Sequence, residues 1–185
     1  MKSLTGLLLC TCLWLFAGGG AVAMAQDSAE DELLLKAAFI YNFAKFTLWP
    51  EDAMGEAGTP FSLCIAGEDD LADALARLSG NQVKGRPLSI LTVREARLPG
   101  RCQMLYVAAS EQRGYPDLLR SLHGRPILTV SELPRFASSG GVIELYREHE
   151  RVRFIINLGI ARGAGLEISP SLLRLAAEVY QGQDP

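Results

Sequence analysis

Residues 33–50, LLLKAAFIYNFAKFTLWP, decide the fold, because they describe a helix with very little polar surface. Two apolar stripes run side by side at the helical spacing of three and four residues. The first stripe contains Leu34, Ala37, Ala38, Tyr41, Ala44 and Leu48, and the second contains Leu35, Phe39, Phe43 and Phe46. Because the residue before a proline is pushed out of the helical region, Pro50 ends the segment. The pattern predicts a helix that the rest of the domain covers on most sides.

The residues before this helix have the composition of a secretory signal peptide. Lys2 supplies a positive start, residues 7–17 are apolar, and residues 23–25 form an Ala-x-Ala cleavage pattern. A membrane-spanning helix needs about 20 continuous apolar residues, and here glycines interrupt the run earlier. We therefore expect residues 1–25 to be a cleaved leader and residues 26–185 to be an exported domain with no membrane insertion after cleavage.

The charge of the chain argues against nucleic acids and anionic membranes as partners. The leader contains one of the 18 Lys and Arg residues and none of the 21 acidic residues, so removing it changes the net charge from −3 to −4. A mildly acidic chain without a basic run lacks the electrostatic footprint of a nucleic-acid-binding protein.

Two of the four cysteines, Cys64 and Cys102, lie outside the leader. In an oxidising compartment such a pair most simply forms a disulfide, and two free buried thiols are the alternative. The two histidines, His123 and His149, have no ligand spacing to each other or to a cysteine, so we expect no metal and no cofactor.

Apolar runs and helical patterns alternate along the chain. Strands are predicted at 61–67, 85–93, 104–108 and 127–130, and helices at 71–78 and 115–122. Such alternation indicates βαβ units around a largely parallel central sheet flanked by helices, in a single α/β domain.

The C-terminal part of the chain has a different pattern. Residues 142–147 and 151–157 form two strands with a short polar joint, which predicts an antiparallel hairpin. Residues 131–137 are expected to form one helical turn capped by Ser131, and residues 159–164 a short helix ended by Gly165. Ser169 and Pro170 then begin a last amphipathic helix that extends to Val179, so two helices follow the hairpin.

No constellation of catalytic residues stands out. The Gly-x-Ser-x-Gly arrangement of a nucleophilic serine is missing from the sequence; His123 lies at a predicted helix end, and His149 lies at the tip of the predicted hairpin. The adjacent Asp69 and Asp70 belong to a helix start, where carboxylates are stabilising without being catalytic. We therefore predict that the protein is not an enzyme.

Three segments together resemble the YfiR-type family of bacterial periplasmic proteins. They are KAAFIYNFAKFTLWP at 36–50, GGVIELYREHERVRFIINL, which we align at 140–158, and GLEISPSLLRLAAEVY at 165–180. The most specific positions are Asn42, Phe43, Phe46, Trp49 and Pro50 at one end, and Asn157, Gly165, Leu166, Ile168, Ser169, Leu172, Leu173, Leu175 and Ala176 at the other.

The resemblance implies a negative regulator without catalytic activity. Such a protein binds the periplasmic domain of an inner-membrane diguanylate cyclase and represses it, which lowers cyclic di-GMP and disfavours biofilm. The resemblance also implies a second partner, an outer-membrane lipoprotein that binds peptidoglycan and sequesters the repressor. The family's best-known member has a cysteine pair that Cys64 and Cys102 match, and a second pair toward the hairpin that this sequence lacks.

Four residues near the hairpin and the last helix are the candidates for a partner-binding surface: Tyr146, Arg153, Phe154 and Ile168. An association site needs apolar area with a polar rim, although Phe154 and Ile168 are equally consistent with the core. The alternative function is a receptor that binds a small molecule where the parallel strands end and feeds another signalling partner. The sequence leaves open whether the protein is a homodimer.

Overall fold

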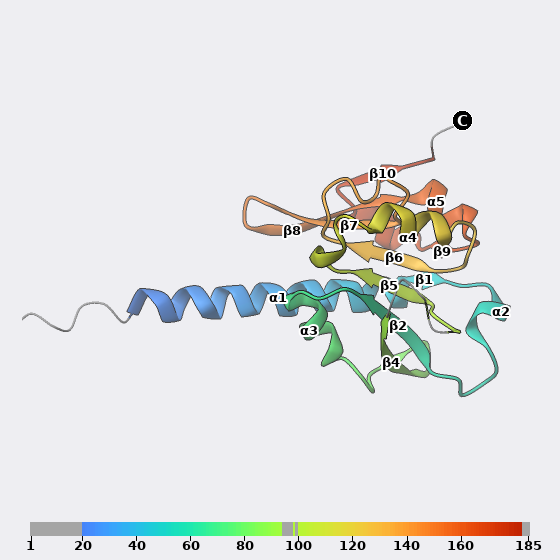
Figure 1. Cartoon of the computed structure of the whole chain (residues 1–185), viewed down its shortest axis with the longest axis horizontal. Helices are drawn as coiled ribbons and strands as arrows, with labels where there is room; N and C mark the ends of the chain where they lie inside the picture. Colours follow the sequence, from blue (N-terminus) through green and yellow to red (C-terminus); the bar gives the residue numbers. More distant parts are fainter. Residues whose placement is uncertain (1–19, 94–97, 99, 183–185) are drawn as a thin grey trace, which may run out of the picture.

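The computed structural model describes residues 20–93, 98 and 100–182. Most of the predicted leader lies outside these residues, and its cleavage stays a prediction. The first described element is α1 (Gly20–Phe46), whose N-terminal part extends beyond the rest of the described chain (Figure 1). The predicted helix at 33–50 is therefore confirmed, except at its C-terminal end.

Helix α1 ends at Phe46 and not at Pro50, because Thr47 and Leu48 form a short strand, β1 (Thr47–Leu48). This strand pairs antiparallel with β9 (Glu167–Ile168), with Thr47 opposite Ile168. The N–H of Ser169 donates to the carbonyl oxygen of Phe46 over 2.9 Å, so a distant segment satisfies a carbonyl at the helix end. The helix stops where this tertiary pairing begins.

Eight strands form the central sheet in the order β10-β8-β7-β6-β5-β2-β4-β3. Strands β4, β2, β5, β6 and β7 are parallel to one another; β8 is antiparallel to β7, β10 is parallel to β8, and β3 is antiparallel to β4. The strands are β2 (Phe61–Ala66), β3 (Gln82–Val83), β4 (Arg86–Val93), β5 (Met104–Val107), β6 (Leu128–Ser131), β7 (Ile143–Glu148), β8 (Arg151–Asn157) and β10 (Glu178–Tyr180). The predicted α/β class, the parallel centre and the C-terminal hairpin are all confirmed.

The remaining helices are short: α2 (Glu51–Met54), α3 (Asp70–Ala76), the 3-10 helix η1 (Ala109–Glu111), α4 (Tyr115–Ser121), α5 (Leu158–Gly163) and α6 (Pro170–Leu175). Ser169 caps α6 by accepting the N–H of Leu172, and Pro170 occupies the first turn, as the sequence predicts. The two predicted C-terminal helices are therefore α5 and α6, and Gly165 has the left-handed φ of 71° expected just past a helix end.

Alternation along the strands divides the core into two layers. On one side of the sheet, Ile40 and Phe43 of α1 pack with residues of β2, β7 and β8. On the other side, α4 contributes Leu118, Leu119 and Leu122 to a cluster that includes Cys64. Because neighbouring side chains of a strand point to opposite faces, β2 and β5 contribute buried residues to both layers.

Two predictions for the C-terminal half are wrong. Residues 134–140 form turns and not the predicted helical turn, because the carboxylate of Glu144 accepts the N–H groups of Arg135 and Ala137 over 3.0 Å each. Ser131 is the last residue of β6, although its Oγ does accept the N–H of Leu133 over 3.1 Å. The carboxylate of Glu144 in β7 thus accepts the backbone N–H groups that a helix would use for its own hydrogen bonds.

The last helix is also shorter than predicted. It ends at Leu175, and Glu178–Tyr180 form β10 beside β8, with Val179 opposite Ile156. The N–H of Ala177 donates to the carbonyl oxygen of Phe154 over 2.8 Å and starts this pairing. Strand β8 would otherwise present an open edge, and pairing it outweighs the helical pattern of the segment.

Candidate partner-binding face

The outward side chains of β7, β8 and β10 form one continuous face of the sheet. Residues that lie directly opposite each other across paired strands share a face, so the register fixes its membership. Tyr146 lies opposite Arg153, and Glu144, Ile155 and Glu178 form the neighbouring row. We call this surface the outer face; it consists of Glu144, Tyr146, Glu148, Arg151, Arg153, Ile155, Glu178 and Tyr180.

The outer face is only partly covered by the described residues. Tyr146, Ile155 and Tyr180 are half-buried and Arg153 is exposed, whereas Glu144 is buried beneath the 135–137 backbone that it binds. The opposite side of the same strands faces α1, and Ile143, Leu145, Phe154 and Ile156 are buried there. Two tyrosines, an isoleucine and an arginine therefore remain accessible side by side on a rigid scaffold.

The pair Tyr146 and Arg153 has the composition of an interface centre. Tyrosine and arginine are enriched among the residues that dominate protein–protein binding energy. The guanidinium Nε of Arg153 lies 3.7 Å from a carboxylate oxygen of Glu148, with 43% of its side chain exposed. Such an exposed pair is weak, so the guanidinium can exchange Glu148 for an acceptor on a partner.

Tyr180 is a member of this face that the sequence analysis missed. Burial raises the pKa of its phenol, and the nearby carboxylates of Glu178 and Glu144 raise it further. The group therefore keeps its proton at neutral pH and can donate a hydrogen bond. The sequence pattern predicted a helix up to Val179, and only the pairing of β10 with β8 places Tyr180 on the outer face, opposite Asn157 and two rows from Tyr146.

The structure places the other two candidates in the interior. Phe154 is 2% exposed, and its ring centroid lies 4.9 Å from that of Phe43 in α1. Ile168 is 7% exposed and lies in β9, outside the eight-stranded sheet. Of the four candidate residues, the fold brings Tyr146 and Arg153 together on the surface and packs Phe154 and Ile168 into the core.

The carboxyl ends of the parallel strands, where a small-molecule receptor would bind its ligand, hold interactions within the chain. The phenol of Tyr106 donates to Asp69 over 2.9 Å, and burial raises its pKa well above the usual range. Nearby, the ammonium of Lys36 lies 2.7 Å from a carboxylate oxygen of Glu132. The side chains that could receive a ligand here already bind one another.

Open space lies instead at the opposite end of these strands. A cavity of about 870 Å³ is lined by loop 138–140, the start of α5 and the end of β10, and it adjoins Tyr180. A second cavity of about 200 Å³ lies beside it, toward the end of α4.

Within the described ranges, no three His, Cys, Asp or Glu side chains gather as a metal site. Among the described helices, none combines the length and apolar character needed to cross a bilayer.

Comparison with known protein families identifies the family to which the chain belongs. A sequence model of the family described as YfiR/HmsC-like matches residues 34–177. The chain belongs to the YfiR/HmsC-like family. Membership in this regulatory family, which is not a known enzyme family, indicates a periplasmic regulator of diguanylate cyclase signalling. The resemblance seen in the sequence is thus confirmed, and β10 follows the matched range.

The residues that mark the YfiR/HmsC-like family have structural roles. The indole N–H of Trp49 donates to the carbonyl oxygen of Gln103 over 2.9 Å. Asn157 caps α5 through Ile160 and donates to the carbonyl oxygen of Ala137 over 2.8 Å. A side chain at Gly165 would contact Pro50, so the N-terminal and C-terminal family motifs meet in space.

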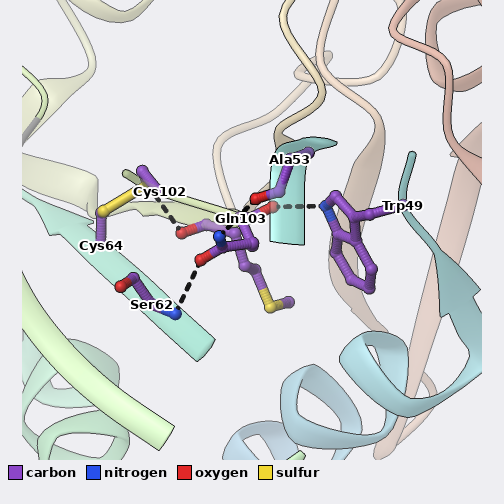
Figure 2. Close-up of a disulfide and its surroundings, with 7 residues drawn as sticks. Trp49, Ala53, Ser62, Cys64, Cys102 and Gln103 are labelled. Carbon is purple, nitrogen blue, oxygen red and sulfur yellow. Dashed lines mark hydrogen bonds between the residues drawn. A yellow bond between two sulfur atoms is a disulfide. The ribbon is translucent and has the colours of Figure 1, made fainter. Parts of the chain in front are cut away.

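The disulfide between Cys64 and Cys102 is present, as the sequence predicts (Figure 2). It joins β2 to the residues just before β5, and the two Cα atoms are 6.0 Å apart. Both cysteines are buried, at 0% and 7% exposure, so the bridge is part of the core of this YfiR/HmsC-like domain.

Proposed function

We propose that the protein binds the periplasmic domain of an inner-membrane diguanylate cyclase through the outer face and holds the enzyme inactive, lowering cyclic di-GMP. The observation that carries the proposal is that Tyr146 and Arg153 lie directly opposite each other on an accessible sheet face, which also includes Tyr180, in a member of a regulatory family. Repression requires only that the regulator bind the inactive state of the cyclase more tightly than its active state.

Release from repression belongs to the same proposal. An outer-membrane lipoprotein with a peptidoglycan-binding domain would sequester the regulator and free the cyclase. Because one surface cannot hold two proteins at once, a lipoprotein that covers the outer face competes directly with the cyclase. A lipoprotein that binds elsewhere must instead draw the regulator away from the inner membrane.

The test uses two substitutions on the outer face and one outside it. Tyr146→Ala removes an aromatic side chain from the face. Arg153→Glu reverses the charge at one position and leaves the neighbouring residues as they are. Truncating a central interface residue costs more than about 1.4 kcal/mol, so each variant should bind the cyclase's periplasmic domain at least about tenfold more weakly. Cyclic di-GMP in cells carrying either variant should rise toward the level of the deletion strain.

Arg174→Glu is the matched control, because Arg174 lies in α6 and its described contact is a hydrogen bond to Ser171 over 3.2 Å. This variant should bind the cyclase domain and repress it like the wild type. Circular dichroism and thermal melting of all three variants establish that they are folded. If Arg153→Glu and Tyr146→Ala repress as well as Arg174→Glu, the outer face is not the binding surface. If deletion leaves cyclic di-GMP unchanged, repression itself is wrong.

A further inference from the structure

One edge of the sheet lies at the opposite end of the strand order from the outer face. At this edge, no strand of the described chain pairs with residues 89–93 of β4. Strand β3 covers only its start, with Val83 opposite Arg86 and Gln82 opposite Pro87. The last residue with backbone hydrogen bonds on this side is Leu88. Its carbonyl oxygen accepts the N–H of Gly80 over 2.9 Å, and its N–H donates to the carbonyl oxygen of Asn81 over 2.7 Å.

The backbone groups that follow point to the same open side. In a strand, every second residue directs its N–H and C=O to the same edge. Because both groups of Leu88 point away from β2, those of Ile90 and Thr92 do so as well. No hydrogen bond from the described part of the chain reaches these four groups.

This edge lacks the usual protection. Natural edge strands discourage pairing with charged side chains, inward-pointing charges or bulges. Residues 87–93, PLSILTV, contain no charged residue, and β4 keeps an unbroken parallel register with β2 from Leu88 to Val93. Ile90, Leu91 and Val93 are half-buried, so a further strand would bury more of their apolar surface. The described edge is therefore uncharged, without a bulge and available for pairing.

A second copy of this chain fits the edge poorly. Antiparallel pairing of two such edges would match Ile90 of one copy with Thr92 of the other. It would also bring the residue after Val93 of each copy opposite Leu88 of the other copy. That position is already taken by Gly80 and Asn81, which bond to Leu88. Symmetric pairing is thus limited to a very short ladder, whereas a free extended segment has no such obstacle.

We propose that the open edge of β4, residues 89–93, binds an extended, uncharged segment of a partner protein by adding it to the sheet as a further strand. Main-chain hydrogen bonds to Ile90 and Thr92 supply the affinity, and β-branched residues of the segment cover the half-buried side chains of β4. This site is separate from the outer face, with five strands between β4 and β10 in the sheet order.

The probe is a short fluorescein-labelled peptide of alternating threonine and valine, titrated into the full mature protein and followed by fluorescence anisotropy. Thr92→Pro removes an outward N–H and places the proline ring on the edge, where proline is tolerated because no ladder hydrogen bond to β2 is lost. Thr92→Ala keeps the N–H and is the matched control. The wild type and Thr92→Ala should bind the peptide, and Thr92→Pro should bind it at least about tenfold more weakly.

A second peptide, methylated at every backbone nitrogen, keeps the test decisive if Thr92→Pro does not fold. The wild type should not bind this peptide, because it cannot donate to the outward carbonyl groups. Absence of binding to the unmethylated peptide, or equal binding by folded Thr92→Pro, overturns the proposal. Concentration-dependent dimerisation that Thr92→Pro abolishes would assign the edge to a second copy and would equally overturn it. Neither outcome bears on repression through the outer face.

Discussion

At the scale of single residues, Gln103 shows how one buried side chain joins three parts of the chain. Its amide oxygen accepts the N–H of Ser62 over 2.8 Å, and its amide nitrogen donates to the carbonyl oxygen of Ala53 over 2.7 Å (Figure 2). Its own carbonyl oxygen accepts the indole N–H of Trp49. With 2% of its surface exposed, Gln103 ties the residue after β1, helix α2 and strand β2 to the start of β5.

Replacing Gln103 with alanine should lower the free energy of unfolding by about 2 to 3 kcal/mol. The substitution removes two buried hydrogen bonds and leaves the N–H of Ser62 without a partner, which costs more than the bond itself contributed. Urea denaturation measures the change. Gln112→Ala, at an exposed position, is the control and should stay within about 0.5 kcal/mol of the wild type. Equal effects of the two substitutions would show that the Gln103 contacts do not stabilise the fold.

At the scale of elements, periodicity predicted most segments correctly and failed where a segment pairs with a distant one. The apolar alternation in β2, β4, β5 and β6 needs only local information, because each strand is bounded by turn residues. Residues 176–180 continue a helical pattern, yet Glu178–Tyr180 pair with β8. A helix and an edge strand bury the same apolar residues of this segment, so only the position of β8 decides between them.

The disulfide belongs to this scale, because it closes the connection between two neighbouring parallel strands. The cysteines are 38 residues apart, and the chain-entropy estimate for a loop of that length is about 3 to 4 kcal/mol. We expect the Cys64→Ala/Cys102→Ala double variant to lose about this much free energy of unfolding. Urea denaturation of the variant and of the wild type in dithiothreitol should give similar values. A wild type whose midpoint is insensitive to the reductant would contradict this role.

At the scale of the whole molecule, an ion-pair network links α1 to the residue after β6 and to the β7–β8 hairpin. Lys36 lies 2.8 Å from Glu32 in the same helix and 2.7 Å from Glu132 after β6, while Arg147 of the hairpin lies 3.2 Å from Glu32. The hydrogen bond from Lys36 lowers the pKa of Glu32 most, and the positive charges of Lys36 and Arg147 lower it further. Burial alone would lower the pKa of Lys36, but its bonds to Glu132 and Glu32 outweigh this and raise it.

This network makes stability depend on pH in acid. Because the folded-state pKa of Glu32 is below its ordinary value of 4.5, its contribution is present above pH 4.5 and is lost as the pH falls through the folded-state pKa. Glu32→Gln should therefore flatten the loss of stability between about pH 5 and 3, by less than about 1 kcal/mol. Urea denaturation over this range measures the slopes, with Glu167→Gln at an exposed position of β9 as the control. Parallel curves for Glu32→Gln and the wild type would exclude the network as a source of acid sensitivity.

The candidate site was only partly predictable from the sequence. Tyr146 and Arg153 could be proposed because the hairpin fixes their register locally. Phe154 was a weaker candidate because alternation places it on the side opposite to Arg153, and which side meets α1 is not a local property. Tyr180 could not be found, because its neighbours on the outer face come from strands more than twenty residues earlier in the chain.

The sequence by itself determined the parts of this protein that local physics decides. These are the apolar helix before Pro50, the alternating strands, the capped start at Ser169 and Pro170, the family and the cysteine pair. The tertiary structure alone decided where α1 ends, that the last residues form β10, and which faces of the sheet stay accessible. The physical reason is that hydrogen bonding and burial between distant segments exceed the small local preferences that a sequence pattern records.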